Sequence, residues 1–446
     1  MISRSHALAE LKAPRYTSYP TAPHFSPATT AQDYAAWLSV LPPAARLSLY
    51  LHVPYCVHLC HYCGCHTKAV RQRDPVDAYA DRLAEEFALV GSLAAARRVG
   101  HLHWGGGTPS LLGTERILDL VAKLGDAFEL AADCEHVFEL DPRYVTPELA
   151  RTLAAVGVTR ASLGVQEFAP DIQSAIGRVQ PFAVVDRAVR VLREFGIGRI
   201  NLDLMYGLPR QTVDDIRTTV DLAASLRPQR VAYFGYAHVP WFKPHQRLID
   251  EAALPGATER LDQAEAARAA LVACGYEAIG LDHFARPDDP LAVAARCGRL
   301  RRNFQGYTTD DAVALIGFGA SAIGRFPHGF VQNATDAGGY ARAIASGRLA
   351  TVRGLAFSAE DRARGRIIER LMCDFFVDLD SVGADEIATG FAAEREELAP
   401  LEAKGLVRID GNRIAVTRAG RPFVRLAAAA FDAYLAKSPT RHSVAV

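Results

Sequence analysis

The stretch YLHVPYCVHLCHYCGCHTK (residues 50–68) joins a short apolar run to a loop that holds half of the chain's eight cysteines. These are Cys56, Cys60, Cys63 and Cys65, in the pattern C-x3-C-x2-C-x-C. Thiols crowded into one loop of an intracellular protein usually bind a metal or carry redox chemistry, because structural disulfides are rare there. The loop therefore predicts a metal or redox centre at the end of a strand.

Beyond this loop, apolar runs alternate with helical patterns as far as about residue 240. Six runs are typical of strands: residues 47–53, 99–104, 136–140, 160–165, 199–205 and 230–236. Helical patterns stand between them at residues 77–94, 147–157, 183–196 and 213–226. Such alternation favours a parallel sheet with right-handed crossovers. We expect an α/β fold, a partial TIM-type (β/α)6 barrel.

Each expected strand is followed by unusual polar or glycine-rich residues. After the cysteine loop come GGGTP (105–109), ELDPR (139–143), GVQEF (164–168), DLMYGLP (203–209) and YAHVP (236–240). In barrels of this kind the carboxyl ends of the strands form the active site. The sequence therefore predicts one site built from six strand ends.

The chain divides into four expected segments. They are an N-terminal arm (1–45), the barrel core (46–245), a barrel extension with substrate-side segments (246–356) and a smaller, mainly α domain (357–446). In the last segment, the pattern predicts one long helix over residues 359–379. It predicts a helix followed by a hairpin that turns at DGN over residues 395–420. This pattern resembles a winged helix, for which we favour a packing or lid role over DNA binding.

Composition excludes some classes of partner. Lys+Arg and Asp+Glu balance at 50 each, so no bulk attraction to nucleic acid or to an anionic membrane is expected. The first residues lack a continuous apolar signal core, and no uncharged apolar run reaches the length of about 18 residues of a spanning helix. We expect a soluble, cytoplasmic protein.

The scattered cysteines, at positions 134, 274, 297 and 373, are expected to be buried.

Two kinds of centre compete for the cysteine loop. Structural zinc takes four ligands, often as two pairs separated by a longer loop, and no second pair is present here. A 4Fe–4S cube needs one ligand for each iron, and Cys56, Cys60 and Cys63 can supply three of them. The fourth iron would then stay open for chemistry. Cys65 lies too near Cys63 to reach another corner comfortably, so we expect it beside the cluster.

The spacing C-x3-C-x2-C, with Tyr62 before the third cysteine, resembles the radical S-adenosylmethionine (SAM) superfamily. The resemblance implies that SAM binds the open iron and that its cleavage yields a radical that abstracts hydrogen from carbon. It also implies SAM contacts from the strand ends, at Gly106, Gly107, Thr108, Glu139, Gln166, Arg178, Asp203 and Ala237. Arg178 would pair with the methionine carboxylate, since a guanidinium fork suits two oxygens. Glu139 and Asp203 each interrupt an apolar run, where a lone carboxylate is costly.

A narrower resemblance rests on several segments in order. They are PRYTSYPTAPHF (14–25), the cysteine loop, HWGGGTPS, GVQEF, NLDLMYGLP, YAHVP, DHFARPDD (282–289) and RNFQGYTT (302–309). Together they resemble the oxygen-independent coproporphyrinogen III oxidases (dehydrogenases) of haem synthesis. The resemblance implies that two propionates of coproporphyrinogen III become vinyl groups, with one SAM consumed for each. The arm at 14–25 would cover the barrel mouth.

The resemblance also suggests further site residues. Tyr50 and Cys65 would act catalytically, with Tyr50 close to SAM. A second SAM would be lined by Tyr62, Cys65, Phe304, Gln305 and Ile323, of which Phe304 and Gln305 would also face substrate. Four propionates require cations, and the candidates are Arg15, Arg286, Arg301 and Arg302.

Three other functions remain open at this stage. A haem-delivering chaperone of the same family would lack Cys65 and the RYTSYPT arm, and a radical SAM enzyme that opens the haem ring would lack DHFARPDD. A bare electron carrier would not need the strand-end residues. The expected partners are coproporphyrinogen III, an electron donor such as a flavodoxin or ferredoxin system and an unidentified electron acceptor. We expect a monomer.

Overall fold

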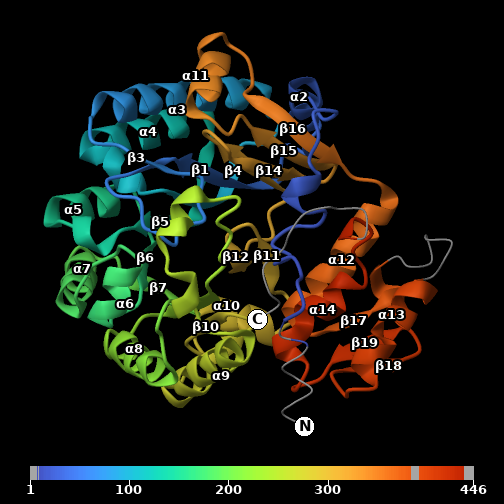
Figure 1. Cartoon of the computed structure of the whole chain (residues 1–446). Helices are drawn as coiled ribbons and strands as arrows, with labels where there is room; N and C mark the ends of the chain where they lie inside the picture. Colours follow the sequence, from blue (N-terminus) through green and yellow to red (C-terminus); the bar gives the residue numbers. More distant parts are fainter. Residues whose placement is uncertain (1–7, 9, 383–390, 436–446) are drawn as a thin grey trace. The chain divides into compact units, whose positions relative to one another are not determined.

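The computed structural model describes residues 8, 10–382 and 391–435, which fall into two compact units (Figure 1). Unit 1 comprises Met1–His24, Leu204–Thr309 and Phe357–Val446, and unit 2 comprises Phe25–Asp203 and Asp310–Ala356. Both units are therefore assembled from segments far apart in sequence. The four segments expected from the sequence remain a prediction.

Unit 2 is built on a mixed sheet whose centre is parallel. Its parallel neighbours are β1 (Arg46–Val53), β4 (Arg98–Gly106), β5 (Glu129–Leu140) and β6 (Arg160–Gln166), followed by β7 (Arg199–Tyr206), which continues into unit 1. On the other side of β1 lie β13 (Ala314–Phe318), β14 (Ile323–Phe326), β15 (Gly329–Asn333) and β16 (Thr351–Ala356). Of these, β13 is parallel to β1 and the rest are antiparallel. The expected strands are present, and parallel pairing is confirmed for β1, β4, β5 and β6.

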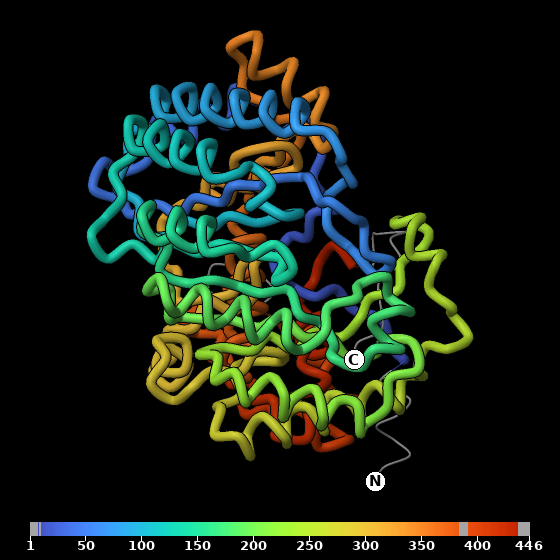
Figure 2. The backbone as a smooth tube through the Cα atoms, turned by 90° about the vertical axis from the view of Figure 1, so that its left-hand side faces the viewer, coloured from blue at the N-terminus to red at the C-terminus, as the bar shows by residue number. Residues whose placement is uncertain are grey.

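Helices connect the parallel strands of unit 2, as the alternating pattern predicted. They are α3 (Asp74–Leu93), α4 (Gly113–Ala127), α5 (Pro147–Ala155), α6 (Pro170–Ala175) and α7 (Phe182–Glu194), with α2 (Ala31–Ser39) and α11 (Ala337–Ala345) from the flanking segments. Figure 2 shows α3, α4 and α5 side by side, in blue to green. Their apolar faces cover a core with the fully buried Trp104, Phe138 and Phe318. This packing fixes the strand ends that carry the predicted site.

Unit 1 contains a smaller α/β part. Its strands follow the order β7, β8 (Arg230–Gly235), β10 (His283–Ala285) and β9 (Glu277–Ile279), with a separate hairpin of β11 (Arg301–Asn303) and β12 (Gly306–Thr308). Its helices are α8 (Val213–Ser225), α9 (Ala257–Ala273) and α10 (Pro290–Arg296). Cys274 and Cys297 are the cap residues that end α9 and α10, and both are exposed. Their predicted burial is wrong, because these helix ends lie at the surface.

The additional C-terminal domain combines helices with a three-stranded sheet. Its elements are α12 (Ala359–Asp374), β17 (Phe376–Asp378), α13 (Ala392–Glu402), β18 (Val407–Asp410), β19 (Arg413–Val416) and α14 (Val424–Ala429). The hairpin at DGN is confirmed, with Asp410 opposite Arg413. The expected helix over 359–379 is too long. Phe375 adopts a left-handed backbone (φ 56°), which ends α12 and turns the chain into β17.

The N-terminal arm packs into this C-terminal domain. Leu8, Tyr16 and Tyr19 belong to the same apolar cluster as Ile367 and Phe431. The Tyr16 hydroxyl donates to Asp432 Oδ2 at 3.1 Å, and the Ala433 N–H donates to the Tyr19 hydroxyl at 3.2 Å. The sequence did not predict this pairing of the two chain ends. A cover over the barrel mouth remains a prediction.

No helix in the described ranges is both long enough and apolar enough to cross a membrane. The polarity of the helices agrees with their role as covers of a sheet, since each presents one apolar face inward.

Of the two remaining scattered cysteines, Cys373 is buried, as expected, and Cys134 is half-buried.

Candidate active site

The cysteine loop leaves β1 and is closed at its base. The short strands β2 (Tyr55–Cys56) and β3 (Lys68–Ala69) pair in parallel, and the Val70 N–H donates to the Cys56 carbonyl at 2.9 Å. At the far end, the His61 N–H donates to the Ile176 carbonyl at 3.0 Å, just after α6. The loop is therefore held at both ends by backbone hydrogen bonds.

Two of the loop's sulfur atoms lie beside hydrogen-bond donors. Cys56 Sγ lies 3.3 Å from Thr67 Oγ1 and 3.5 Å from Thr108 Oγ1. Cys60 Sγ receives the Arg178 Nη1–H at 3.4 Å. Burial raises the pKa of the Cys56 thiol, and the two threonine hydroxyls act in the opposite sense. These donors favour the thiolate form, which is the form that ligates iron.

The donor set fits an iron–sulfur cluster. Cys56, Cys60 and Cys63 come from one loop, and the Cys63 N–H donates to the Cys60 carbonyl at 3.2 Å. No three described His, Cys, Asp or Glu side chains are grouped closely enough for a single metal ion. In a 4Fe–4S cluster each iron takes its own protein ligand, so the cysteines need not converge on one point. The spacing of the three cysteines and their thiol groups therefore fit such a cluster. Cys65 is exposed, and a hydrogen bond with Cys63 is the main cause that raises the pKa of its thiol.

The glycine triplet lies directly against the cysteine loop. The Gly107 N–H donates to the Val53 carbonyl at 2.8 Å, and the Thr108 N–H donates to the Tyr55 carbonyl at 2.7 Å. A Cβ at Gly107 would lie 2.5 Å from the Tyr55 carbonyl oxygen, and Gly106 has a φ of +107°. The glycines are therefore required by the approach of two protein segments. The amides of Gly106, Gly107 and Thr108 bind protein oxygens, and their contacts with SAM remain a prediction.

A chain of polar side chains runs along the ends of β1, β4 and β5. The Tyr50 hydroxyl lies 3.1 Å from His52 Nδ1, and the Tyr50 ring packs 5.8 Å from the His103 ring. His103 Nε2 lies 2.8 Å from Glu139 Oε1, and the Gly106 N–H donates to Glu139 Oε2 at 3.3 Å. Glu139 is thus fixed at the strand end as predicted, with His103 as a partner that the sequence left unassigned.

The end of β6 brings Gln166 and Arg178 together. Gln166 adopts a left-handed backbone (φ 71°), a conformation that is costly for a side-chain residue and recurs at functional sites. Arg178 is buried, donates to the Gly164 carbonyl at 2.6 Å and lies 3.2 Å from Asp141 Oδ2. Burial opposes the charge of Arg178, but nearby anionic groups such as Asp141 raise its pKa overall. The predicted pairing of Arg178 with a SAM carboxylate remains a prediction, and its contact with Cys60 is a finding.

Asp203 is oriented by neighbouring strands of unit 2. The Ser162 hydroxyl donates to Asp203 Oδ2 at 3.0 Å, and the Asn201 amide donates to Asp203 Oδ1 at 2.9 Å. These two hydrogen bonds fix the orientation of the Asp203 carboxylate. Ile323, the candidate for a second SAM, begins β14 in the same unit and pairs with Gln332.

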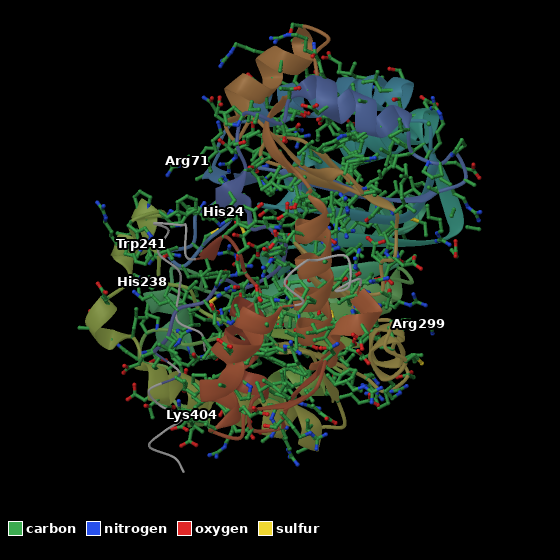
Figure 3. The ribbon with its side chains drawn as sticks, turned by 90° about the vertical axis from the view of Figure 1, so that its right-hand side faces the viewer. His24, Arg71, His238, Trp241, Arg299 and Lys404 are labelled. Atoms are coloured by element: carbon green, nitrogen blue, oxygen red, sulfur yellow. The ribbon has the colours of Figure 1, made fainter. Side chains whose placement is uncertain are left out.

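The remaining predicted residues belong to unit 1. Ala237 follows β8 in a loop whose His238 and Trp241 are labelled in Figure 3, and its carbonyl receives the Gln246 amide at 3.2 Å. Phe304 and Gln305 form the turn between β11 and β12. The four candidate arginines separate into two pairs. Arg286 and Arg301 face the surface carboxylates Asp288 and Glu369, whereas Arg15 and Arg302 lie together.

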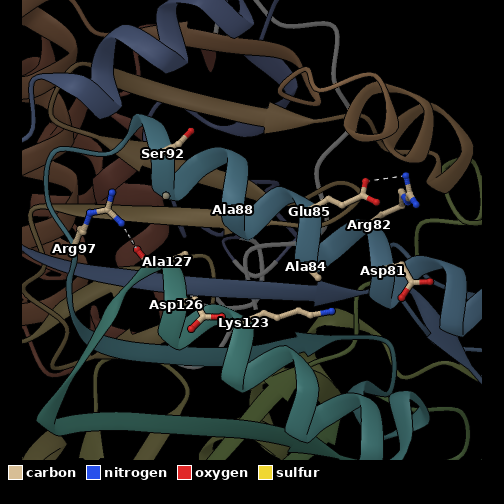
Figure 4. Close-up of a pocket in the computed structure, with 11 residues that line it drawn as sticks. Asp81, Arg82, Ala84, Glu85, Ala88, Ser92, Arg97, Lys123, Asp126 and Ala127 are labelled. Carbon is tan, nitrogen blue, oxygen red and sulfur yellow. Dashed lines mark hydrogen bonds and ion pairs between the residues drawn. The ribbon is translucent and has the colours of Figure 1, made fainter.

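A surface cavity of about 800 Å³ lies apart from these residues. It is lined mainly by α3 and α4 of unit 2 (Figure 4). Among its lining residues, Arg82 forms an ion pair with Glu85 at 2.8 Å, and Arg97 donates to the Ala127 carbonyl at 2.8 Å. None of the residues predicted for the site lines it, so it adds nothing to the candidate active site.

Comparison with known proteins agrees with this geometry. The Radical SAM superfamily matches residues 50–223, and the HemN C-terminal domain matches residues 357–423. The chain is 50% identical over 442 residues to an oxygen-independent coproporphyrinogen III oxidase of Bradyrhizobium diazoefficiens, covering 98% of both chains. It is 45% identical to the protein of that name from Paracoccus denitrificans, again over 98% of both.

A solved structure is similar over nearly the same length. It is described as coproporphyrinogen III oxidase (HemN) from Escherichia coli, a radical SAM enzyme, with a TM-score of 0.90 and 39% identity. The match covers 94% of this chain and 98% of that one. The cysteine loop, the strand-end residues and the C-terminal domain all lie inside these matches, so this chain belongs to the oxygen-independent coproporphyrinogen III oxidase family of the radical SAM superfamily.

Proposed function

We propose that this chain catalyses the oxygen-independent oxidative decarboxylation of coproporphyrinogen III to protoporphyrinogen IX. One observation carries the proposal: relatives named for this activity match 98% of the chain at 45–50% identity. The matched length includes the arm, the cysteine loop and the C-terminal domain. The donors already placed at Cys56 and Cys60 support the same conclusion from the structure.

The reaction balances for each of the two propionates. A –CH2–CH2–COO⁻ group becomes –CH=CH2 when it loses one hydrogen atom from the β-carbon, one CO2 and one electron. The hydrogen atom leaves in 5′-deoxyadenosine, and the electron passes to an acceptor that the cell supplies. When bound, the iron–sulfur cluster and SAM provide the one-electron chemistry that removes hydrogen from an unactivated carbon. Two such events consume two SAM molecules.

The chain's own residues would bind and orient these groups. Cys56, Cys60 and Cys63 would hold three irons. Arg178, beside the Cys60 sulfur, would offer its guanidinium to a carboxylate near the fourth iron. Glu139 and Asp203, each held by hydrogen bonds, would accept hydrogen bonds from amino or ribose groups. Tyr50 and Cys65 would stand at the substrate side of the same strand ends.

Two features favour this function over the related alternatives. Cys65 is present, and the arm is an integral part of the C-terminal domain core through Tyr16 and Tyr19. A haem-delivering chaperone is expected to lack both features. The strand-end side chains are also arranged for a ligand, which a bare electron carrier does not require.

The cellular context is part of the proposal. A flavodoxin or ferredoxin system would supply the electron that starts each event, because the reaction needs a strong one-electron donor. Thiols that hold an iron cube require a reducing compartment, which supports a cytoplasmic location. We propose that the enzyme works as a monomer.

The test is an anaerobic assay of the reconstituted chain with SAM, a reductant and coproporphyrinogen III. We expect protoporphyrinogen IX and 5′-deoxyadenosine to form together. SAM cleavage without loss of CO2 would reject the substrate and leave the superfamily assignment in place. Cys65→Ala is expected to keep its full iron content, and a loss of iron in that variant would make Cys65 a ligand.

A further inference from the structure

A short exposed strand of unit 2 runs directly beside the first predicted iron ligand. The strand β3 pairs in parallel with β2, and Ala69 stands opposite Cys56. Five exposed residues, from this strand and from the chain that follows it, form what we call the β3 surface: Lys68, Ala69, Arg71, Gln72 and Arg73. Neighbouring strands lie about 4.8 Å apart, so a single strand spacing separates the β3 surface from the backbone of Cys56.

A hydrogen bond continues from this strand to the Cys56 sulfur. Thr67 directly precedes the exposed Lys68, and Thr67 Oγ1 lies 3.3 Å from Cys56 Sγ. The strand is held in place because the Lys68 N–H donates to the Pro54 carbonyl at 3.0 Å. Electron tunnelling weakens steeply with distance and passes more readily through bonds than through gaps. The β3 surface therefore offers a short, bonded route from an exposed strand to the sulfur of a cluster ligand.

The β3 surface also carries positive charge. Residues 54–73 contain three Lys or Arg residues and no Asp or Glu, whereas the whole chain has equal numbers of the two kinds. Lys68 lies over the Tyr55 ring, 5.5 Å from its centre, and Arg71 is labelled in Figure 3. Among the residues that the structure describes, neither of these two cations forms an ion pair with a carboxylate.

The carboxylates that follow along the chain have other partners. Asp77 pairs with Arg73 at 3.0 Å and with Arg116 of α4 at 3.3 Å. Asp74 stands in the first turn of α3, where a carboxylate faces the positive end of the helix dipole. Because the net charge of the chain is zero, electrostatic attraction of a partner has to come from a local surface. Lys68 and Arg71 provide such a surface.

We propose that the β3 surface is the docking surface for a small acidic protein that carries one electron. The inference rests on the proposed function, because each decarboxylation starts with an electron from a strong one-electron donor. In the transfer, the reduced carrier loses one electron and the iron–sulfur cluster gains it, with no bond made or broken. A partner rich in carboxylates complements Lys68 and Arg71, and opposite charges speed the encounter of the two proteins.

Binding of an acidic flavodoxin to the reconstituted full chain tests this surface. The double variant Lys68→Glu/Arg71→Glu reverses both charges. The matched control, Arg151→Glu/Arg187→Glu, changes the net charge equally at two exposed arginines of α5 and α7 in the same unit. At low ionic strength we expect the first variant to bind oxidised flavodoxin about tenfold more weakly than the parent, and the control to bind it equally. The difference should shrink at about 0.5 M salt, which screens charges beyond a few ångströms.

A second measurement separates docking from assembly of the iron–sulfur cluster. Both double variants should hold as much iron as the parent. Sodium dithionite is a small reductant that needs no docking surface, so it should drive SAM cleavage at the parent rate in both variants. Reduced flavodoxin, in contrast, should reduce the cluster of Lys68→Glu/Arg71→Glu about tenfold more slowly than that of the parent.

The outcomes distinguish this inference from the proposed function. No binding of flavodoxin by the parent, or equal affinity in the parent and Lys68→Glu/Arg71→Glu, would overturn the docking surface. Binding of phosphatidylglycerol vesicles through these residues, without binding of flavodoxin, would overturn it as well. If flavodoxin reduces the cluster through Lys68 and Arg71 but no protoporphyrinogen IX forms, the proposed substrate fails and the docking surface stands. Protoporphyrinogen IX formed with dithionite would support the proposed function whichever way flavodoxin binds.

Discussion

The cysteine loop of unit 2 and four neighbouring arginines of unit 1, Arg15, Arg260, Arg302 and Arg425 (the arginine cluster), surround their polar atoms with different partners. In the loop, the Cys56 sulfur has two hydroxyl groups beside it and the Cys60 sulfur has a guanidinium. In the arginine cluster, Arg302 donates to the carbonyls of Tyr16 and Arg15, and Arg15 and Arg260 donate to those of Gly235 and Tyr236. The first region places hydrogen-bond donors beside sulfur, whereas the second places cations beside backbone carbonyl oxygens.

This difference shows which hydrogen-bond partners each region already has within the protein. A thiolate that already has donors can bind iron without further rearrangement of its neighbours. Unit 2 also contains the fully buried carboxyl of Glu86, which three protein donors satisfy, so it provides a second example of the first kind.

The largest effect is expected from Cys60→Ala. The variant loses one of three iron ligands and leaves Arg178 without its sulfur partner, so we expect loss of the cluster and of both reaction products. Iron content and anaerobic product formation measure this. Cys274→Ala, at the exposed end of α9, is the control and should behave as the parent. Full iron content in Cys60→Ala would refute the assignment of this cysteine.

A smaller effect concerns stability as a function of pH. The Glu86 carboxyl accepts hydrogen bonds from the Gly319 N–H and the Tyr340 hydroxyl at 2.7 and 2.9 Å, and from the Asn333 amide at 2.7 Å. Burial raises its pKa to about 7 despite these donors. The folded chain therefore holds this proton more tightly than the unfolded chain. The free energy of unfolding should fall by about 3 kcal/mol as pH rises from the acidic range through 7.

Denaturant titrations across this pH range check the Glu86 prediction. Glu86→Gln carries no titrating proton at this position, so its stability should lack this part of the pH dependence. Equal pH slopes in Glu86→Gln and the parent would show that another group is responsible.

Gly107→Ala should disturb the cysteine loop directly. The new Cβ would lie 2.5 Å from the Tyr55 carbonyl oxygen, which is backbone and cannot rotate away. We expect a loss of about 2 kcal/mol in stability together with reduced cluster assembly. Gly64→Ala is the control within the same loop, since no atom lies within 4 Å of its added Cβ. Equal behaviour of the two variants would contradict the packing role of Gly107.

The smallest effect is expected at the hydroxyl groups beside Cys56. Thr108→Val removes one of them, at a cost of about 1 kcal/mol to the negatively charged sulfur. For a one-electron couple this lowers the reduction potential of the cluster by roughly 40 mV. Electrochemistry of the reconstituted protein measures the shift, and Thr108→Ser, which keeps the hydroxyl, should not show it. A potential in Thr108→Val equal to that of the parent would argue against the hydrogen bond.

Much of unit 2 was predictable because its signals are local. Apolar runs that alternate with helical patterns fixed the parallel strands, and the polar interruptions at positions 139 and 203 marked strand ends. Local signals misled where a backbone conformation intervened. Phe375 adopts a left-handed backbone inside a stretch whose pattern is that of one continuous helix.

The arginine cluster was only half predictable. Arg15 and Arg302 stand in segments that resemble the family, but Arg260 and Arg425 lie in helical patterns like those of any surface arginine. Nothing in either helix indicates that its arginine is buried beside another cation. The pairing of the N-terminal arm with the C-terminal domain, through Tyr16 and Asp432, was invisible for the same reason.

The sequence by itself determined the chemistry of the cysteine loop and the α/β order of unit 2. Ligand spacing and strand periodicity are properties of neighbouring residues, so they can be read without a fold. Only the tertiary structure decided which donors stand beside each sulfur and which four arginines share one place. Those arrangements join residues hundreds of positions apart, and their energies depend on burial and distance, which arise only when the chain has folded.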